Sequence, residues 1–166
     1  MEVVVRLFIC GFSGAGKSTL GREVASRLNK TFIDTDEVLA DGKRLADQIE
    51  LWGWPKFRRL ESELVMRVSG GLKGDSLVVS LGGGALSDET VRATKTKGCK
   101  LAWLDTPFEQ CWERINGDKD RPLTAKGKDE LEKLYGERIH LYKSADITVC
   151  GSEAVDELVS YMASFS

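Results

Sequence analysis

Short apolar runs rich in Val, Ile and Leu alternate along the chain with longer segments of helical periodicity. The runs predict five strands, at residues 3–10, 31–34, 77–81, 100–104 and 147–150. The periodic segments predict helices at 17–28, 42–51, 55–69, 88–97, 107–116, 129–143 and 153–164. Nearly continuous apolar strands must be covered on both faces and joined by helical crossovers. The pattern therefore predicts an α/β fold, a three-layer α/β/α arrangement around a five-stranded parallel sheet.

Polar caps and glycines mark several of the predicted helix ends. We interpret Ser87, Thr106 and Ser152 as N-caps, because each precedes acidic residues or proline in a first helical turn. Gly98 and Gly117 lie where helices should stop. No repeat, low-complexity tract or long linker divides the chain, so we expect one domain over residues 1–166.

The composition is that of one compact soluble domain and excludes several classes of function. Lys and Arg number 24 and Asp and Glu number 26, so the net charge of −2 gives no general attraction to nucleic acid or to an anionic membrane. No run approaches the roughly 20 apolar residues of a membrane span, and the N-terminus does not resemble a signal peptide. We expect a cytoplasmic protein, and its small size without an extra apolar face favours a monomer.

The cysteines and the histidine do not form a recognisable site. Cys10, Cys99, Cys111 and Cys150 are far apart and form no CxxC pair, so we expect reduced thiols. His140 is the one histidine, which excludes a histidine-pair metal site, and its neighbours are typical of a helix side.

The strongest chemical signal is a phosphate-binding loop between the first predicted strand and the first predicted helix. Residues 11–19 read Gly-Phe-Ser-Gly-Ala-Gly-Lys-Ser-Thr and satisfy the pattern G-x-x-x-x-G-K-[ST]. Glycines let the backbone turn its N–H groups toward phosphate oxygens, and the next helix presents its free N–H groups to the same anion. The residues predicted to bind the nucleotide here are Gly14, Ala15, Gly16, Lys17, Ser18 and Thr19. Lys17 would neutralise the β- and γ-phosphates, and Ser18 would ligate Mg²⁺.

Two aspartates close the second predicted strand, whereas the third strand runs into glycines and lacks the acid that many nucleoside triphosphatases carry there. Asp34 and Asp36 are two residues apart, so in an extended chain both carboxylates point the same way. Parallel strands end at the sheet edge that holds the phosphate loop, so one carboxylate could face a metal and the other a substrate hydroxyl. The alternative is that Asp36 only caps the following helix.

Two further segments place arginines near the same edge. Arg58 precedes Glu61 by three residues, a spacing that lets the acid hold the guanidinium, although an ordinary solvated pair is the alternative. Residues 116–128 are charged, contain glycine and are too irregular for a core, which predicts a mobile lid. Arg121, carried on this lid, could reach a transferring phosphoryl group when the lid closes.

Taken together, these motifs resemble the shikimate kinases, a family of small P-loop kinases. They occur in the family's order along nearly the whole chain: the phosphate loop, Asp34-Thr35-Asp36, Phe57-Arg58-x-x-Glu61, Leu81-Gly82-Gly83-Gly84-Ala85, Arg121-Pro122-Leu123 and Arg138-x-x-x-Tyr142-x-x-x-Ala145-Asp146. The resemblance implies strand order 2-3-1-4-5 and a substrate-binding helical region at about 34–62. It also implies transfer of the γ-phosphoryl group of ATP to the 3-hydroxyl of shikimate, a step of aromatic amino acid biosynthesis.

The resemblance further implies a role for each residue around the transferred group. Asp36 would orient and deprotonate the attacking hydroxyl, while Lys17 and Arg121 would lie on either side of the γ-phosphoryl group. Asp34 would act on Mg²⁺ through water. Arg114 resembles the family's arginine that lies against the adenine.

On the acid side, the resemblance assigns Arg58 and Arg138 to the shikimate carboxylate, since planar guanidinium groups match planar carboxylates. Gly83, with Gly82 and Gly84, would offer backbone N–H groups to a ring hydroxyl. We interpret the three bare glycines as allowing the ring to approach the backbone closely.

The chain also departs from the family pattern. Trp54 and Pro55 stand where the family usually has an acid, so Trp54 could stack on the substrate; the alternative is that Trp52 and Trp54 fill the gap between helix and sheet. The stretch from Arg121 to Arg138 looks slightly shorter than in typical members.

Two other functions stay open at this point. A kinase for another small polyol acid such as gluconate would share the fold and the phosphate machinery, and only Arg58, Arg138 and the three glycines separate the two. A nucleotide-binding protein without turnover is the other. The presence of Lys17, Asp36 and Arg121 favours catalysis.

Overall fold

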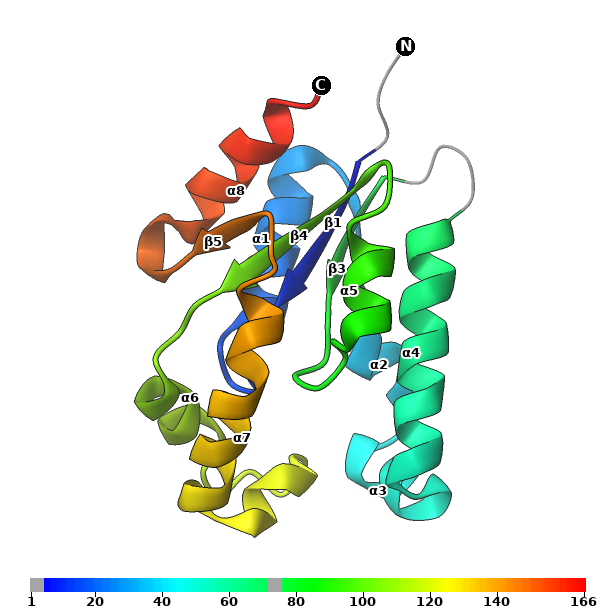
Figure 1. Ribbon diagram of the computed structural model, residues 1–166, viewed down its shortest axis with the longest axis vertical. Coiled ribbons are helices and arrows are strands. Elements are labelled where there is room, and N and C mark those ends of the chain that lie inside the picture. The colour runs from blue at the N-terminus through cyan, green and yellow to red at the C-terminus, as the bar shows by residue number, and fades with distance from the viewer. Residues whose placement is uncertain (1–4, 72–75) are drawn as a thin grey trace.

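The computed structural model describes residues 5–71 and 76–166, and its strands form one parallel sheet between layers of helices (Figure 1). The strands are β1 (Arg6–Cys10), β2 (Thr31–Asp34), β3 (Leu77–Ser80), β4 (Cys99–Leu104) and β5 (Ile147–Val149). Their order is β2-β3-β1-β4-β5. The predicted three-layer α/β/α architecture and the strand order are therefore confirmed; the predicted start of the first strand, at residues 3 and 4, lies outside the described residues.

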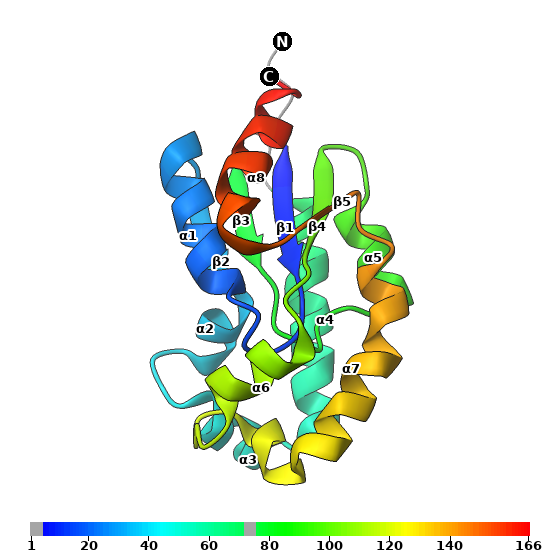
Figure 2. The same ribbon diagram turned by 90° about the vertical axis from the view of Figure 1, so that its left-hand side faces the viewer.

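Helices cover both faces of the sheet and extend past one end of it. They are α1 (Lys17–Leu28), α2 (Thr35–Ala40), α3 (Leu45–Trp52), α4 (Trp54–Gly70), α5 (Asp88–Thr94), α6 (Phe108–Ile115), α7 (Lys128–Tyr142) and α8 (Ala154–Ala163), with 3-10 turns η1 (Pro122–Lys126) and η2 (Gly151–Glu153). Helices α1 and α8 lie together on one face, and α4 and α5 lie together on the other (Figure 2). Beyond the carboxyl ends of the strands lie α2, α3, α6 and η1 (Figure 1).

Strand β1 lies at the centre of the sheet, which explains its nearly continuous apolar sequence. Leu7, Phe8 and Ile9 are completely buried between the two helical layers. Ile9 is in register with Ser80 of β3 and Ala102 of β4. The carboxyl end of β1, from which the phosphate loop leaves, is therefore fixed by two neighbouring strands.

A second, smaller apolar cluster lies outside the sheet and joins α2, α3 and α4. Its buried members are Leu39, Ile49, Phe57 and Leu64. This cluster holds the three helices as one unit beside the carboxyl edge of the sheet, within the region predicted to bind the substrate.

The chain between Asp34 and the third helix differs from the prediction. A helix, α2, begins directly after β2, and the helix predicted at 42–51 is observed at Leu45–Trp52. The Asp34 carboxylate caps α2 by accepting from the N–H groups of Asp36 (2.9 Å) and Glu37 (3.3 Å). The idea that both aspartates extend from one strand is therefore wrong, and so is the idea that Asp36 is the cap.

The predicted caps have mixed outcomes. Ser87 is confirmed, since it forms a capping box with Thr90 at the start of α5. Thr106 is wrong as a cap, because its hydroxyl instead donates to the Ala15 carbonyl at 2.8 Å. Ser152 is also wrong, since it lies inside η2 and α8 begins at Ala154.

Within the described ranges, no helix is long and apolar enough to span a bilayer.

Candidate active site

The phosphate loop connects β1 to α1 and packs against α6. Gly14 and Gly16 have φ of +82° and +100°, a region that favours glycine. A Cβ on Gly14 would lie only 2.7 Å from both the Cys111 carbonyl and the Ile115 side chain. Gly16 is the N-cap of α1 and supplies no side chain there, so the amide groups of the first helical turn are free to meet an anion.

Lys17 lies inside this loop with only 8% of its surface exposed. Its ammonium donates to the Phe12 carbonyl at 2.8 Å. Burial lowers the pKa of Lys17 to about 8; the Asp36 carboxylate opposes this shift, and the Arg121 cation adds to it. The Ala15 N–H also donates to Phe12, at 3.0 Å, so this amide is occupied in the observed loop.

A cavity of about 470 Å³ opens beside the loop and gathers side chains from distant parts of the chain. The residues around it that matter for the chemistry are Gly14, Gly16, Lys17, Ser18, Thr19, Asp34, Asp36, Arg58, Glu61, Gly83, Gly84, Arg114 and Arg121. Of the predicted site residues, Ala15, Gly82 and Arg138 do not line it. The structure thus brings most of the predicted nucleotide and acid sites into one space.

The two predicted metal ligands meet at the edge of this cavity. The Ser18 hydroxyl donates to the Asp34 carboxylate, whose other oxygen caps α2. Magnesium prefers oxygen ligands and usually keeps several waters, so one hydroxyl and one nearby carboxylate beside bound phosphates suit it. Within the described residues, no cluster of three or more His, Cys, Asp or Glu side chains could hold a metal.

Asp36 lies in the first turn of α2 and lines the cavity. Burial raises the pKa of its carboxyl group, and the neighbouring Asp34 carboxylate raises it further. The cations of Lys17, Arg121 and Arg58 oppose the shift. A carboxylate with a raised pKa, next to the phosphate loop, is suited to accept a proton from a substrate hydroxyl.

Arg58 and Glu61 form a partly buried ion pair on α4, with 2.8 Å between Nη1 and Oε1. The Glu61 side chain is only 2% exposed. Burial raises the pKa of Glu61, and the Arg58 guanidinium opposes that rise. The alternative of an ordinary solvated pair is therefore wrong: Glu61 fixes Arg58 at the cavity wall.

The three consecutive glycines make room for these side chains. A Cβ on Gly82 would overlap the Asp36 carboxylate, and one on Gly84 would overlap the Arg58 guanidinium. The Gly82 N–H donates to the Thr35 hydroxyl at 2.9 Å, so it is not free for a ligand. At Gly82 and Gly84, the absence of a side chain thus makes room for the Asp36 carboxylate and the Arg58 guanidinium, a reason that the interpretation from the sequence, close approach of a substrate ring, did not include.

Arg138 lies on α7, beside the cavity. Its guanidinium carbon is 5.7 Å from the Phe12 ring centroid. Its Nη1 atom is buried and has no hydrogen-bond partner among the residues that the structure describes. Burial lowers the pKa of Arg138; the Tyr142 hydroxyl opposes this shift, and the Arg58 cation adds to it. Tyr142 itself donates to the Gly83 carbonyl at 3.0 Å, which ties α7 to the glycine segment.

The segment predicted as a lid lies over the phosphate loop. Arg121 donates from Nη1 to the Ser13 hydroxyl at 2.8 Å and pairs with Asp118 at 3.2 Å. Part of the segment is regular, since residues 122–126 form η1. Asp118 was not predicted, although its position three residues before Arg121 is a spacing that signals such a pair.

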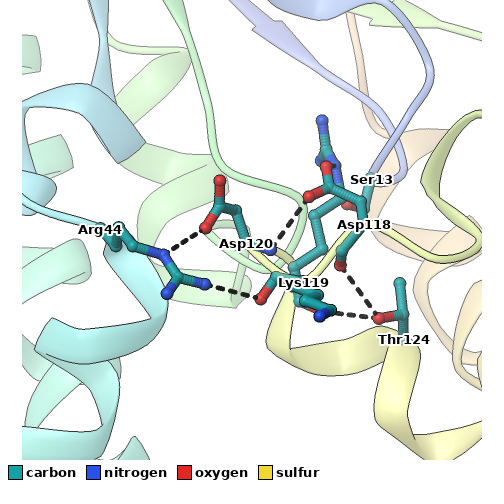
Figure 3. A network of polar contacts seen from close by, with 7 residues as sticks. Ser13, Arg44, Asp118, Lys119, Asp120 and Thr124 are labelled. Carbon is teal, nitrogen blue, oxygen red and sulfur yellow. Dashed lines mark hydrogen bonds and ion pairs between the residues drawn. The ribbon is translucent and has the colours of Figure 1, made fainter.

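A second contact joins the segment predicted as a lid to the helical region at the other side of the cavity (Figure 3). Arg44, at the start of α3, pairs with Asp120 at 2.6 Å and donates to the Lys119 carbonyl at 3.4 Å. Nothing in the sequence links positions 76 residues apart, so this contact could be found only from the structure.

Arg114 extends from α6 to the phosphate loop. Its Nη1 donates to the carbonyls of Gly14 and Ala15, both at 3.0 Å. Thr106, which also donates to Ala15, adds a third bond from the same segment. The resemblance implied that Arg114 lies against the adenine, which stays a prediction; these bonds to the phosphate loop were not predicted.

Comparison with known proteins agrees with this geometry. The family model of the shikimate kinases matches residues 13–165. The chain belongs to the shikimate kinase family. It is therefore an ATP-dependent kinase, as the resemblance implied.

Two relatives show the extent of the similarity. Shikimate kinase from Persephonella marina is 38% identical over 146 residues, covering 86% of this chain and 87% of the relative. The enzyme from Rhizobium leguminosarum is 37% identical over 158 residues, covering 93% of this chain and 79% of the relative.

Solved structures agree as well. Shikimate kinase from Acinetobacter baumannii in complex with shikimate has a TM-score of 0.84 at 28% identity, covering 98% of this chain and 92% of that chain. A gluconokinase from Sinorhizobium meliloti has a TM-score of 0.54 at 17% identity, covering 99% of this chain and 93% of that chain, so it shares the fold only.

Proposed function

We propose that this kinase transfers the γ-phosphoryl group of ATP to the 3-hydroxyl of shikimate, giving ADP and shikimate 3-phosphate. The observation that carries the proposal is that Lys17 of the phosphate loop, Asp36 and the Arg58–Glu61 pair line one cavity. A phosphate site, a proton acceptor and a carboxylate site thus lie within reach of one small molecule.

The acid would bind at the side formed by α4 and the glycine segment. Arg58 is held by Glu61, which leaves its other N–H groups for a substrate carboxylate. The buried Nη1 of Arg138, which has no partner among the described residues, would gain one from the same carboxylate. Gly83 and Gly84 form the wall next to the ring.

The nucleotide would bind with its phosphates on the loop and on the first turn of α1. Ser18, and Asp34 through water, would hold Mg²⁺, which when bound neutralises charge on the β- and γ-phosphates. Gly14, Gly16 and Thr19 complete the phosphate side of the cavity.

For the transfer itself, the oxygen of the shikimate 3-hydroxyl would attack the γ-phosphorus in line, while Asp36 accepts the hydroxyl proton. The bond between the γ-phosphorus and the oxygen that bridges it to the β-phosphate breaks, and ADP leaves. Lys17 and Arg121 would stabilise the charge on the phosphoryl oxygens.

We assign residues 116–128 as the lid that carries Arg121 and excludes water, about 34–62 as the acid-binding region, and Arg114 as the residue beside the adenine. A cytoplasmic location, a monomeric state and the absence of nucleic acid or membrane partners remain predictions from composition.

A coupled assay of ADP release tests the proposal against its alternatives. ATP and Mg²⁺ are supplied with shikimate, with gluconate, or with no acceptor. We expect turnover with shikimate only, and mass spectrometry should detect shikimate carrying one added phosphoryl group. Faster turnover with gluconate would indicate a kinase for another polyol acid. ATP binding without turnover on either acid would indicate a nucleotide-binding protein without catalysis.

A further inference from the structure

Trp54 is part of the cavity wall, and its position is fixed by its neighbours in the chain. It begins α4 directly after Gly53, whose φ of +81° lets α3 end and α4 begin without a linker. Pro55 follows at the start of the helix, where its ring restricts the backbone. The indole therefore extends from a rigid corner and lines the cavity.

The indole lies against the guanidinium that we assign to the substrate carboxylate. The Arg58 Cζ atom is 5.1 Å from the Trp54 ring centroid and 5.4 Å from that of Phe57. The two rings are edge to face, with centroids 5.8 Å apart and planes at 85°. Positions 54 and 58 are one helical turn apart, so α4 itself brings the indole and the guanidinium together.

These contacts restrict Arg58 more than its ion pair alone would. The Arg58 side chain is 34% exposed and bonds to Glu61 through Nη1, so the ion pair holds one end of the guanidinium but does not by itself fix the orientation of its plane. Aromatic faces attract a guanidinium and hold its plane in place. Phe57 is a buried member of the helical cluster, whereas Trp54 is only partly buried and reaches the cavity.

We propose that Trp54 is a positioning residue that determines preference for a carboxylated acceptor: its indole holds the Arg58 guanidinium in the orientation that pairs with the carboxylate. The proposal rests on the proposed function, since it names how that site recognises its acid. The two interpretations of Trp54 from the sequence, stacking on the substrate and filling a gap between helix and sheet, are the alternatives that the experiments must exclude.

Trp52 provides a matched control. It lies two residues earlier, at the end of α3, and packs against the same helical cluster as Trp54. It does not line the cavity, and the cation–π contacts of Arg58 found in the described residues involve Trp54 and Phe57. Loss of either indole therefore removes similar apolar packing, but only loss of Trp54 should free the guanidinium.

The first experiment compares Trp54→Leu, Trp54→Phe and Trp52→Leu in steady-state kinetics. For Trp54→Leu we expect KM for shikimate to rise about 5- to 20-fold with KM for ATP unchanged, which matches the usual strength of a partly desolvated cation–π contact. Trp54→Phe keeps an aromatic face and should recover most of the loss. Trp52→Leu should leave the ratio of the two KM values as in the wild type.

The second experiment tests whether Trp54 acts through Arg58. With the methyl ester of shikimate, which lacks the charge, Trp54→Leu and the wild type should have similar kcat/KM. The double variant Trp54→Leu/Arg58→Ala should resemble Arg58→Ala, since the indole then has nothing to position.

The outcomes separate this proposal from the proposed function. A wild type without shikimate-dependent turnover contradicts the proposed function. Turnover in the wild type with an unchanged KM in Trp54→Leu contradicts the role of Trp54 alone. If Trp54→Leu lowers kcat/KM equally for the ester and for shikimate, or if it lowers kcat/KM further in the Arg58→Ala background, the indole acts on the substrate ring or on folding. Either result overturns the proposal as well.

Discussion

The two halves of the cavity are built in different ways. The half that we propose for the nucleotide is built mainly on one continuous segment, residues 11–19, which is bent at Gly14 and Gly16 and runs into the first turn of α1. The half that we propose for the acid is assembled from α2, α4 and the glycine segment. Side chains of α2 and α4 lie in the space that a Cβ on Gly82 or Gly84 would occupy. We therefore expect changes in the nucleotide half to affect chemistry directly, and changes in the acid half to affect recognition of the acid through neighbouring side chains.

The largest effect should come from Asp36, which lies where the two halves meet. Asp36→Asn keeps the size of the side chain but removes the proton acceptor, so kcat should fall by about 100-fold or more with ATP binding nearly intact. Because the pKa of Asp36 is raised, the wild type should lose activity on acidification at a higher pH than an ordinary aspartate would cause. A pH profile of kcat measures both, and a variant with nearly wild-type kcat would show that Asp36 is not the base.

Lys17→Met, in the half that we propose for the nucleotide, should lower activity but raise stability. We expect kcat to fall by about 100- to 1000-fold, as for loss of a preorganised charge at a transition state. Because burial lowers the pKa of Lys17 from 10.5 to about 8, the unfolded chain binds more protons between these values, and wild-type stability should rise with pH across that window.

At pH 7 the buried Lys17 charge costs up to about 3 kcal/mol, and the bond to Phe12 returns about 1 kcal/mol. Lys17→Met should therefore raise the free energy of unfolding by about 2 kcal/mol at pH 7, with a smaller gain near pH 10. Urea unfolding at both pH values measures this. A variant less stable than the wild type at pH 7 would contradict the idea that the charge is costly in the empty loop.

In the acid half, Arg58→Ala and Arg138→Ala should each raise KM for shikimate by about 10- to 100-fold, the usual range for a lost charge-assisted bond. KM for ATP should change little in either variant. Equal losses for both substrates would point to misfolding, which a thermal melt would reveal.

The smallest effect should come from the contact between the halves. The Arg44–Asp120 pair is exposed, with 54% and 63% of the side chains accessible, so it contributes little to stability. Arg44→Asp should lower kcat by about 2- to 5-fold by loosening the segment that carries Arg121, and the exchange Arg44→Asp/Asp120→Arg should restore it. An exchange variant no better than the single variant would show that the pair does not position the lid.

The two halves of the cavity also differ in how well the sequence predicts them. The strands, their parallel arrangement and the phosphate loop could be read from local pattern, because apolar runs and one continuous motif specify them. The reason for the bare glycines could not, since the side chains that would collide with a Cβ on Gly82 or Gly84 come from α2 and α4.

The two errors have different physical origins. Helix α2 was missed because it is short and lies among polar residues, although Asp34 before Thr35 is an ordinary capping signal. Thr106 looked like a cap because it precedes proline, but its hydroxyl bonds to a carbonyl 91 residues away. Only the second error depends on a partner that is near in space but distant along the chain, which spacing in the sequence does not reveal.

The bonds from Thr106 and Arg114 to the phosphate loop have one more consequence. Carbonyl oxygens repel phosphate, and a flexible loop could turn a peptide group so that an oxygen faces the incoming anion. Here the oxygen atoms of Gly14 and Ala15 accept three hydrogen bonds from the stretch that leads from β4 through α6. That stretch thus fixes the orientation of these two peptide groups before a nucleotide arrives, and spares binding the work of reorienting them.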